Sequence, residues 1–105
     1  MKARAAAVAL AAALCLAAAG CGSSSGGGDT GRELFAARCG SCHTLKSAGT
    51  SGQIGPSFDD LEVTRPVVLA AIKEGPGSMP SGLVKGADAQ KVSSFLQAAS
   101  GGQTP

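Results

Sequence analysis

The clearest periodic pattern lies near the carboxyl end of the chain. Apolar side chains recur there at positions i, i+3, i+4 and i+7, in Val92, Phe95, Leu96 and Ala99. This spacing places them on one face and predicts an amphipathic helix over residues 87–100. Asp88 lies in the first turn of this helix, where a negative charge interacts favourably with the helix dipole.

Two further helices are predicted upstream. Residues 30–39 begin with Thr30, which can cap the helix while Glu33 reaches back to it, and Gly31 and Phe35 then share one face. Residues 64–75 place a proline in the first turn and a glycine at the end, the usual positions of these residues in a helix, and Val68 shares a face with Ile72.

The segments between the helices lack a periodic pattern. Residues 44–63 are rich in Gly, Ser, Thr and Pro, and Pro76 and Pro80 interrupt the stretch before the last helix. No alternation typical of a strand is visible, so we predict an all-α domain without strands. So small a domain, with Phe35, Phe58 and Phe95 as its aromatic residues, lacks part of its own core, and a buried cofactor would complete it.

The amino-terminal residues have the pattern of an export signal. Lys2 and Arg4 precede an apolar, alanine-rich run that ends in small residues before Cys21. We therefore predict a signal peptide at 1–20, a Gly/Ser tether at 21–28 and a folded domain at 29–105. The sequence "AAGC" resembles the lipobox of bacterial lipoproteins, which implies a lipid on Cys21. Cleavage at "AAA" without lipid, or an uncleaved anchor helix, are the alternatives.

Outside the predicted signal, the charged residues say little about function. The chain has nine basic and seven acidic residues, but two of the basic ones lie in the signal, so the remainder is balanced. It contains no basic run and neither Tyr nor Trp for stacking on bases. We therefore expect no nucleic-acid partner.

The sequence "CGSCH", residues 39–43, carries the candidate chemistry. Cys39 and Cys42 are the cysteines that lie beyond the signal and tether, and His43 is the single histidine of the chain. Such a cluster suits a dithiol redox switch, a zinc site or covalent haem attachment. A closed zinc site needs four ligands, and this cluster offers three. A thioredoxin-like dithiol needs a βαβ context, and no strand is predicted.

Haem attachment accounts for the whole cluster. The two thiols are spaced to form thioethers with the haem vinyl groups, and the histidine that follows reaches the iron. Export agrees with this reading, because bacterial haem attachment of this kind takes place outside the cytoplasm. We therefore predict one haem c bound through Cys39 and Cys42, with His43 as an iron ligand.

Residues 30–100 resemble a small class I monohaem cytochrome c. The resemblance rests on "GRELFAARCGSCHTL", "GPSFDDL", "IKEGPGSMP" and the closing helix with "FL", in this order. It implies an all-α cytochrome c fold of three to four short helices wrapped around one covalently attached haem. It also implies that Met79 is the sixth iron ligand, that the Pro56 carbonyl accepts a hydrogen bond from the His43 imidazole, and that Gly31 and Phe35 mark a crossing with the last helix.

The function implied by the resemblance is one-electron transfer by a carrier that is not an enzyme. We expect a monomer at the periplasmic or outer face of the cytoplasmic membrane, lipid-anchored, and exchanging electrons with an oxidase, reductase or dehydrogenase. Two alternatives stay open: a haem enzyme or gas sensor with a labile sixth ligand, and a haemless dithiol or lipid-anchored binding domain. The haem propionates have four candidate partners, Arg38, Lys46, Lys73 and Lys85.

Overall fold

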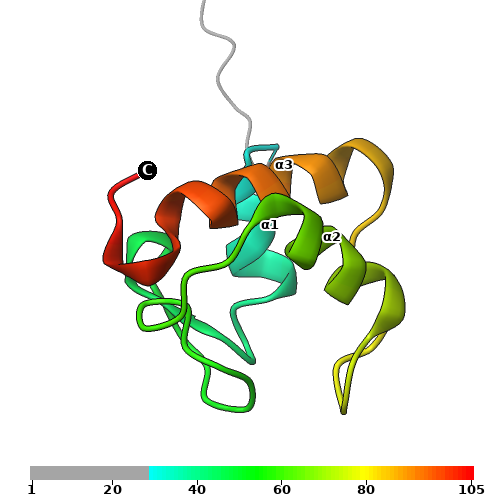
Figure 1. Cartoon of the computed structure of the whole chain (residues 1–105), viewed down its shortest axis with the longest axis horizontal. Helices are drawn as coiled ribbons and strands as arrows, with labels where there is room; N and C mark the ends of the chain where they lie inside the picture. Colours follow the sequence, from blue (N-terminus) through cyan, green and yellow to red (C-terminus); the bar gives the residue numbers. More distant parts are fainter. Residues whose placement is uncertain (1–28) are drawn as a thin grey trace, which may run out of the picture.

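The computed structural model describes residues 29–105, and its regular structure is mostly helical (Figure 1). The α-helices are α1 (Gly31–Arg38), α2 (Arg65–Glu74) and α3 (Gly86–Ala99). The 3₁₀ segment η2 (Lys46–Ala48) lies between α1 and α2, and η3 (Ser100–Gly102) directly follows α3. The predicted all-α class is confirmed. The predicted signal, the tether and Cys21 lie outside the described residues.

The start of α1 is fixed by the capping box that its sequence predicts. The Thr30 hydroxyl accepts from the Glu33 backbone N–H at 3.1 Å, and the Glu33 carboxylate accepts from the Thr30 N–H at 3.1 Å. Two amide groups that the first helical turn leaves unpaired thus find partners. The helix ends at Arg38, directly before the cysteine–histidine cluster.

Helix α2 also has the predicted ends. Pro66 lies in its first turn, and Gly75 follows its last residue in the left-handed conformation, with φ of 63°. Glycine adopts this conformation without a steric penalty, and its N–H bonds to the Ala71 carbonyl at 2.8 Å. The chain can therefore turn sharply into the loop that carries Met79.

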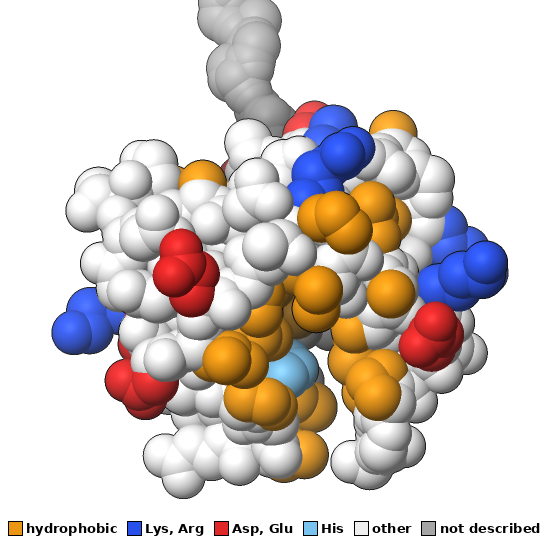
Figure 2. Space-filling view, viewed as in Figure 1, with side chains coloured by type: hydrophobic (Ala, Val, Ile, Leu, Met, Phe, Trp, Pro, Cys, Tyr) orange, Lys and Arg blue, Asp and Glu red, His pale blue; other side chains and the backbone are white. Residues whose placement is uncertain are grey.

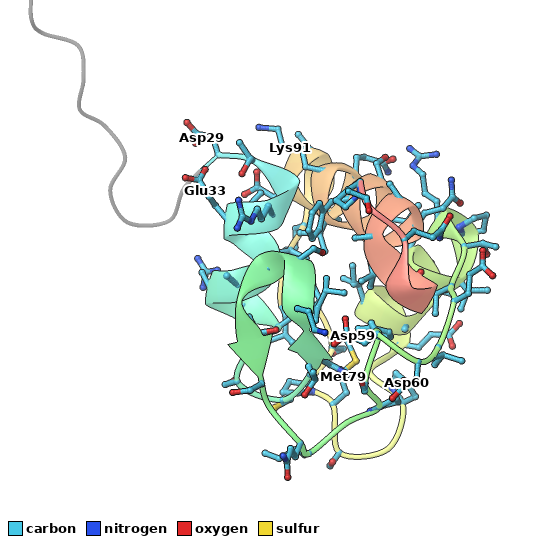
Figure 3. All side chains as sticks on the ribbon, turned by 90° about the vertical axis from the view of Figure 1, so that its left-hand side faces the viewer. Asp29, Glu33, Asp59, Asp60, Met79 and Lys91 are labelled. Carbon is cyan, nitrogen blue, oxygen red and sulfur yellow. The ribbon has the colours of Figure 1, made fainter. Side chains whose placement is uncertain are left out.

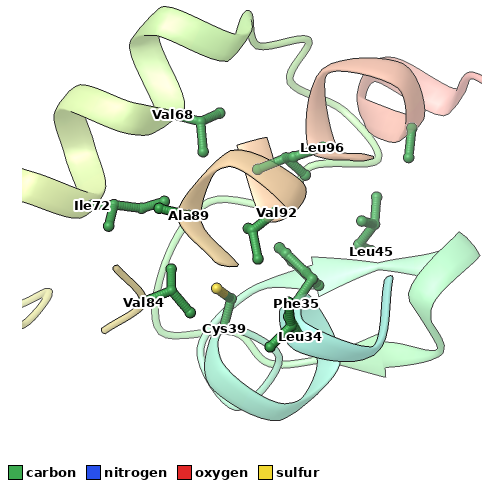
Figure 4. Close-up of a cluster of buried hydrophobic side chains, with 11 residues drawn as sticks. Leu34, Phe35, Cys39, Leu45, Val68, Ile72, Val84, Ala89, Val92 and Leu96 are labelled. Carbon is green, nitrogen blue, oxygen red and sulfur yellow. The ribbon is translucent and has the colours of Figure 1, made fainter. Parts of the chain in front are cut away.

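The core forms where the three helices meet. Phe35 from α1 and Val92 from α3 are almost completely buried, and Val68 from α2 packs into the same cluster (Figure 4). A Cβ atom at Gly31 would lie 2.3 Å from the Lys91 carbonyl oxygen, so α1 and α3 cross with their backbones nearly touching. The expected crossing of the first and last helices is confirmed.

The prediction that the chain lacks strands is wrong at one place. Two-residue strands β1 (Thr44–Leu45) and β2 (Thr50–Ser51) pair antiparallel around η2. The Thr50 hydroxyl reinforces the pairing, because it accepts from the Leu45 N–H at 3.0 Å and donates to the His43 carbonyl at 2.9 Å. A strand of two residues is too short for alternation to appear in the sequence.

Among residues 29–105, no helix has the length and apolar character needed to span a bilayer.

Candidate functional site

The cluster at residues 39–43 continues the chain path of α1 as a tight turn. The Gly40 N–H bonds to the Phe35 carbonyl at 2.9 Å, and the N–H groups of Cys42 and His43 both reach the Cys39 carbonyl, at 3.2 and 3.1 Å. This winding brings the two cysteines and the histidine to one region of the structure. The helix that begins at the capping box therefore positions the chemistry that follows it.

No disulfide joins Cys39 to Cys42. Burial raises the pKa of the Cys39 thiol to about 11, and the neighbouring Cys42 adds to this effect. Redox-active cysteine pairs depend on thiol pKa values that are lowered, which favours the reactive thiolate. The surroundings of Cys39 have the opposite effect and do not favour a dithiol switch.

The imidazole of His43 has a defined hydrogen-bond partner. Its Nδ1 lies 2.9 Å from the carbonyl oxygen of Pro56, the contact that the resemblance implies. Because a carbonyl can only accept, this contact places the proton on Nδ1 and leaves the lone pair of Nε2 free. Such a contact orients a metal-binding imidazole and raises its basicity as a ligand.

Backbone hydrogen bonds hold the Pro56 segment against the cluster. The Gly55 N–H bonds to the Cys42 carbonyl at 2.7 Å, and the Phe58 N–H bonds to the Thr44 carbonyl at 2.8 Å. The Thr44 hydroxyl also donates to the Gly52 carbonyl at 2.8 Å. The segment between β2 and α2 has no periodic pattern, but it is firmly tied to the residues around His43.

Met79 lies on the loop between α2 and α3 (labelled in Figure 3). The base of this loop is closed, because the Gly82 N–H bonds to the Ile72 carbonyl at 2.7 Å. Within the loop, the Met79 N–H bonds to the Pro76 carbonyl at 3.1 Å. The Met79 side chain is partly buried and packs against the hydrophobic core, so the loop holds it facing inward.

A single cleft brings these residues together. Its volume is about 390 Å³, within the range of roughly 300–1,000 Å³ that is usual for sites of small molecules and cofactors. Figure 2 shows the histidine inside this hollow, with apolar side chains around it. All five site residues predicted from the sequence line it: Cys39, Cys42, His43, Pro56 and Met79. Most of the other lining side chains are apolar, as a hydrophobic macrocycle requires.

The cleft also contains residues that sequence reasoning did not assign to the site. The ring of Phe58 stacks on the His43 imidazole, with 4.6 Å between centroids and 26° between planes. Ile54, Leu61 and Val67 line the cleft although each is exposed. The position of Phe58, two residues after Pro56, was the available signal: a segment aimed at the imidazole brings its neighbours there too.

The four candidate propionate partners lie around different hollows of the structure. Arg38 lines the cleft, whereas Lys73 and Lys85 line a second hollow beside α2 and Lys46 lines a third near the carboxyl end. Within residues 29–105, no group of three or more His, Cys, Asp or Glu side chains is arranged to hold a metal ion. The His43 imidazole and the Met79 thioether, both in the lining of the cleft, are donor types that haem iron uses in other proteins.

Comparisons with known proteins agree with this geometry. Residues 26–96 match the family described as cytochrome c oxidase, cbb3-type, subunit III. The structure is similar to that of the c-type cytochrome SorU from Sinorhizobium meliloti, with a TM-score of 0.65 and 30% sequence identity. That match covers 71% of this chain and 92% of SorU. No curated protein shows significant similarity.

The cysteine spacing, the free imidazole nitrogen and the apolar cleft all fit a covalently attached haem, and the family match extends from the end of the Gly/Ser stretch into α3. The chain therefore belongs to the c-type cytochrome family described as cytochrome c oxidase, cbb3-type, subunit III, and its cofactor is haem c bound covalently through the cysteines of its CxxCH motif.

Proposed function

We propose that this protein is a one-electron carrier in which His43 and Met79 bind the haem iron from its two sides. The main support for this proposal is the position of these two side chains. The two side chains come from distant parts of the chain and yet line the same apolar cleft, together with both cysteines. In Figure 1, the segment after α1 and the loop between α2 and α3 both extend below the helices, on opposite sides of the view.

The haem supplies an iron that can gain and lose one electron, and the protein residues fix its surroundings. The Cys39 and Cys42 thiols would hold the haem as thioethers, in which sulfur would join one carbon of a vinyl group and hydrogen the other. His43 offers Nε2, because its Nδ1 proton is donated to Pro56. Met79 offers its sulfur. With His43 and Met79 both bound, the iron would keep no open position for a substrate, which favours a carrier over an enzyme.

The same residues favour a relatively high reduction potential. A thioether sulfur is a soft, neutral donor that stabilises ferrous iron, and methionine–histidine ligation raises the potential. The largely apolar lining of the cleft acts in the same direction, because a low dielectric disfavours the additional positive charge of ferric iron. We infer that electrons cross near the thioethers, where Cys42 is only partly buried.

The ligand assignment is tested by spectroscopy of the wild-type holoprotein. Bonding between sulfur and iron gives the ferric protein a weak absorption band near the red end of the visible spectrum, and we expect this band. We also expect the reduced protein not to bind carbon monoxide readily. Absence of the band together with ready carbon monoxide binding would favour the alternative, an enzyme or gas sensor with a labile sixth position.

We further propose an exported, lipid-anchored monomer that meets exported or membrane-bound redox proteins, such as an oxidase, a reductase or a dehydrogenase. The proposal is supported by the signal-like residues 1–20, by Cys21 and by the family to which the chain belongs. Mass spectrometry of the mature protein tests it, because haem and acyl additions are read together. A mature chain that begins elsewhere and carries no acyl group would contradict the anchor.

A further inference from the structure

The imidazole of His43 is held by an aromatic face as well as by a hydrogen bond. The Phe58 ring lies nearly parallel to it, 4.6 Å away between centroids and tilted by 26°. The Pro56 carbonyl meets the Nδ1 edge of the same imidazole at 2.9 Å. These two contacts act on different parts of the ring, one on its edge and the other on its face.

The hydrogen bond alone leaves the plane of the imidazole undetermined. It fixes where Nδ1 lies, but the ring can still turn about the line that joins Nδ1 to its acceptor. A ring stacked at this distance blocks that rotation, because turning the imidazole would drive its edge into the phenyl face. Phe58 therefore limits the orientation of the His43 plane, together with the backbone of Gly55, which lies against the same ring.

Phe58 is itself well fixed. Its N–H bonds to the Thr44 carbonyl at 2.8 Å, and its carbonyl accepts from the Gly101 N–H at 2.8 Å. Its ring meets Phe35 edge to face, with 6.1 Å between centroids and 68° between planes. Phe35 is completely buried and continues the contact to Phe95 of α3, at 6.3 Å. A row of packed rings thus connects the last helix to the histidine.

We propose that Phe58 is a positioning residue that sets the plane of the His43 imidazole at the haem iron. The proposal rests on the proposed function, in that His43 is taken to be an axial ligand. The plane of an axial imidazole determines which iron d orbital mixes with its π electrons. A residue that fixes this plane influences the g-values of the ferric iron and its reduction potential without touching the iron, as neighbours of metal ligands commonly do.

The experiment compares three variants of the holoprotein by electron paramagnetic resonance of the ferric form and by redox titration. Phe58→Leu keeps an apolar side chain but removes the aromatic face, and we expect shifted and broadened g-values with a changed potential. Phe58→Tyr keeps the face and should retain the wild-type g-values. Phe95→Leu removes a ring from the same row without contacting His43, so it should retain the wild-type g-values and potential even if stability falls.

Two results would overturn the proposal: wild-type g-values in Phe58→Leu, or equal changes in the Leu and Tyr variants. A measurement on the wild-type protein keeps the test independent of variant folding. In the diamagnetic ferrous form, we expect nuclear Overhauser effects between the ring protons of Phe58 and His43, and their absence would also overturn the proposal. Failure of the proposed function is distinguishable, because it appears in the wild-type protein as the missing red-end absorption band.

Discussion

The backbone of Gly55 lies directly against the imidazole of His43. A Cβ atom at Gly55 would be 2.4 Å from Cε1 and 2.8 Å from Nδ1 of that ring, closer than non-bonded carbon atoms can approach. Only glycine, which has no Cβ, therefore fits at this position. Together with Pro56 and Phe58, it encloses the His43 imidazole. The segment around Gly55 therefore serves to position the His43 imidazole.

Replacing Gly55 by Ala should displace either the imidazole or the segment around it. We expect less holoprotein on expression and a free energy of unfolding lower by roughly 1–3 kcal/mol, the usual cost of overpacking. Urea denaturation followed by haem absorbance measures this change. Gly77→Ala is the control. Its added Cβ would meet no atom within 4 Å, but alanine would be strained at the φ of 60° that Gly77 adopts. It should cost about 1–2 kcal/mol for the left-handed backbone and leave the haem spectrum unchanged.

A second prediction concerns the crossing of α1 and α3. Gly31→Ala would place a Cβ 2.3 Å from the Lys91 carbonyl oxygen and 2.7 Å from the Phe95 Cβ, so the two helices must separate. We expect a loss of roughly 1–3 kcal/mol, which lowers the melting temperature by about 4–8 °C per kcal/mol for a domain of this size. Ala37→Leu enlarges an exposed side chain of the same helix and should change stability by less than about 0.5 kcal/mol. Equal melting temperatures for wild type and Gly31→Ala would refute the close crossing.

A third prediction isolates the sulfur of Met79. Met79→Leu conserves most of the side-chain volume but removes the thioether, so the haem should stay attached while the reduction potential falls markedly. The reduced variant should also bind carbon monoxide. Leu83→Met makes the converse exchange in the same cleft and should change neither property. An unchanged potential and ferric spectrum in Met79→Leu would show that this sulfur does not bind the iron.

The helices could be predicted from the sequence because their signals are local. The Thr30–Glu33 pair, Pro66 and Gly75 each determine a helix end through contacts within a few residues. The β1–β2 pair could not be predicted in this way. It is too short to show alternation, and the Thr50 hydroxyl that supports it reaches backbone groups seven and five residues away.

The candidate site could likewise be predicted from the sequence only in part. The CxxCH residues favour haem attachment over a zinc site or a dithiol switch, because thioether formation with the two vinyl groups requires that spacing. Met79 and Pro56 were assigned from the resemblance, and the structure adds that both line the cleft. The role of Phe58 was missed. Its place two residues after Pro56 indicates that it lies near His43, but the stacking itself depends on how the two segments pack.

The last prediction concerns pH and the capping box of α1. Hydrogen bonds hold the pKa of Glu33 below its ordinary value of 4.5: the Thr30 backbone N–H has the largest effect, followed by the Thr30 hydroxyl and the Asp29 N–H. A carboxyl group whose pKa is lowered by folding contributes stability that is fully present above its unfolded pKa and is lost as pH falls through its folded pKa. Glu33→Gln should therefore be less stable than wild type near neutral pH, and the difference should shrink in acid. Glu74→Gln is the matched control, because a negative charge at the end of α2 opposes the helix dipole and its removal should not destabilise the protein. Urea denaturation between about pH 3 and pH 7 measures both differences, and a Glu33→Gln difference that stays constant down to the acid limit would contradict the assignment.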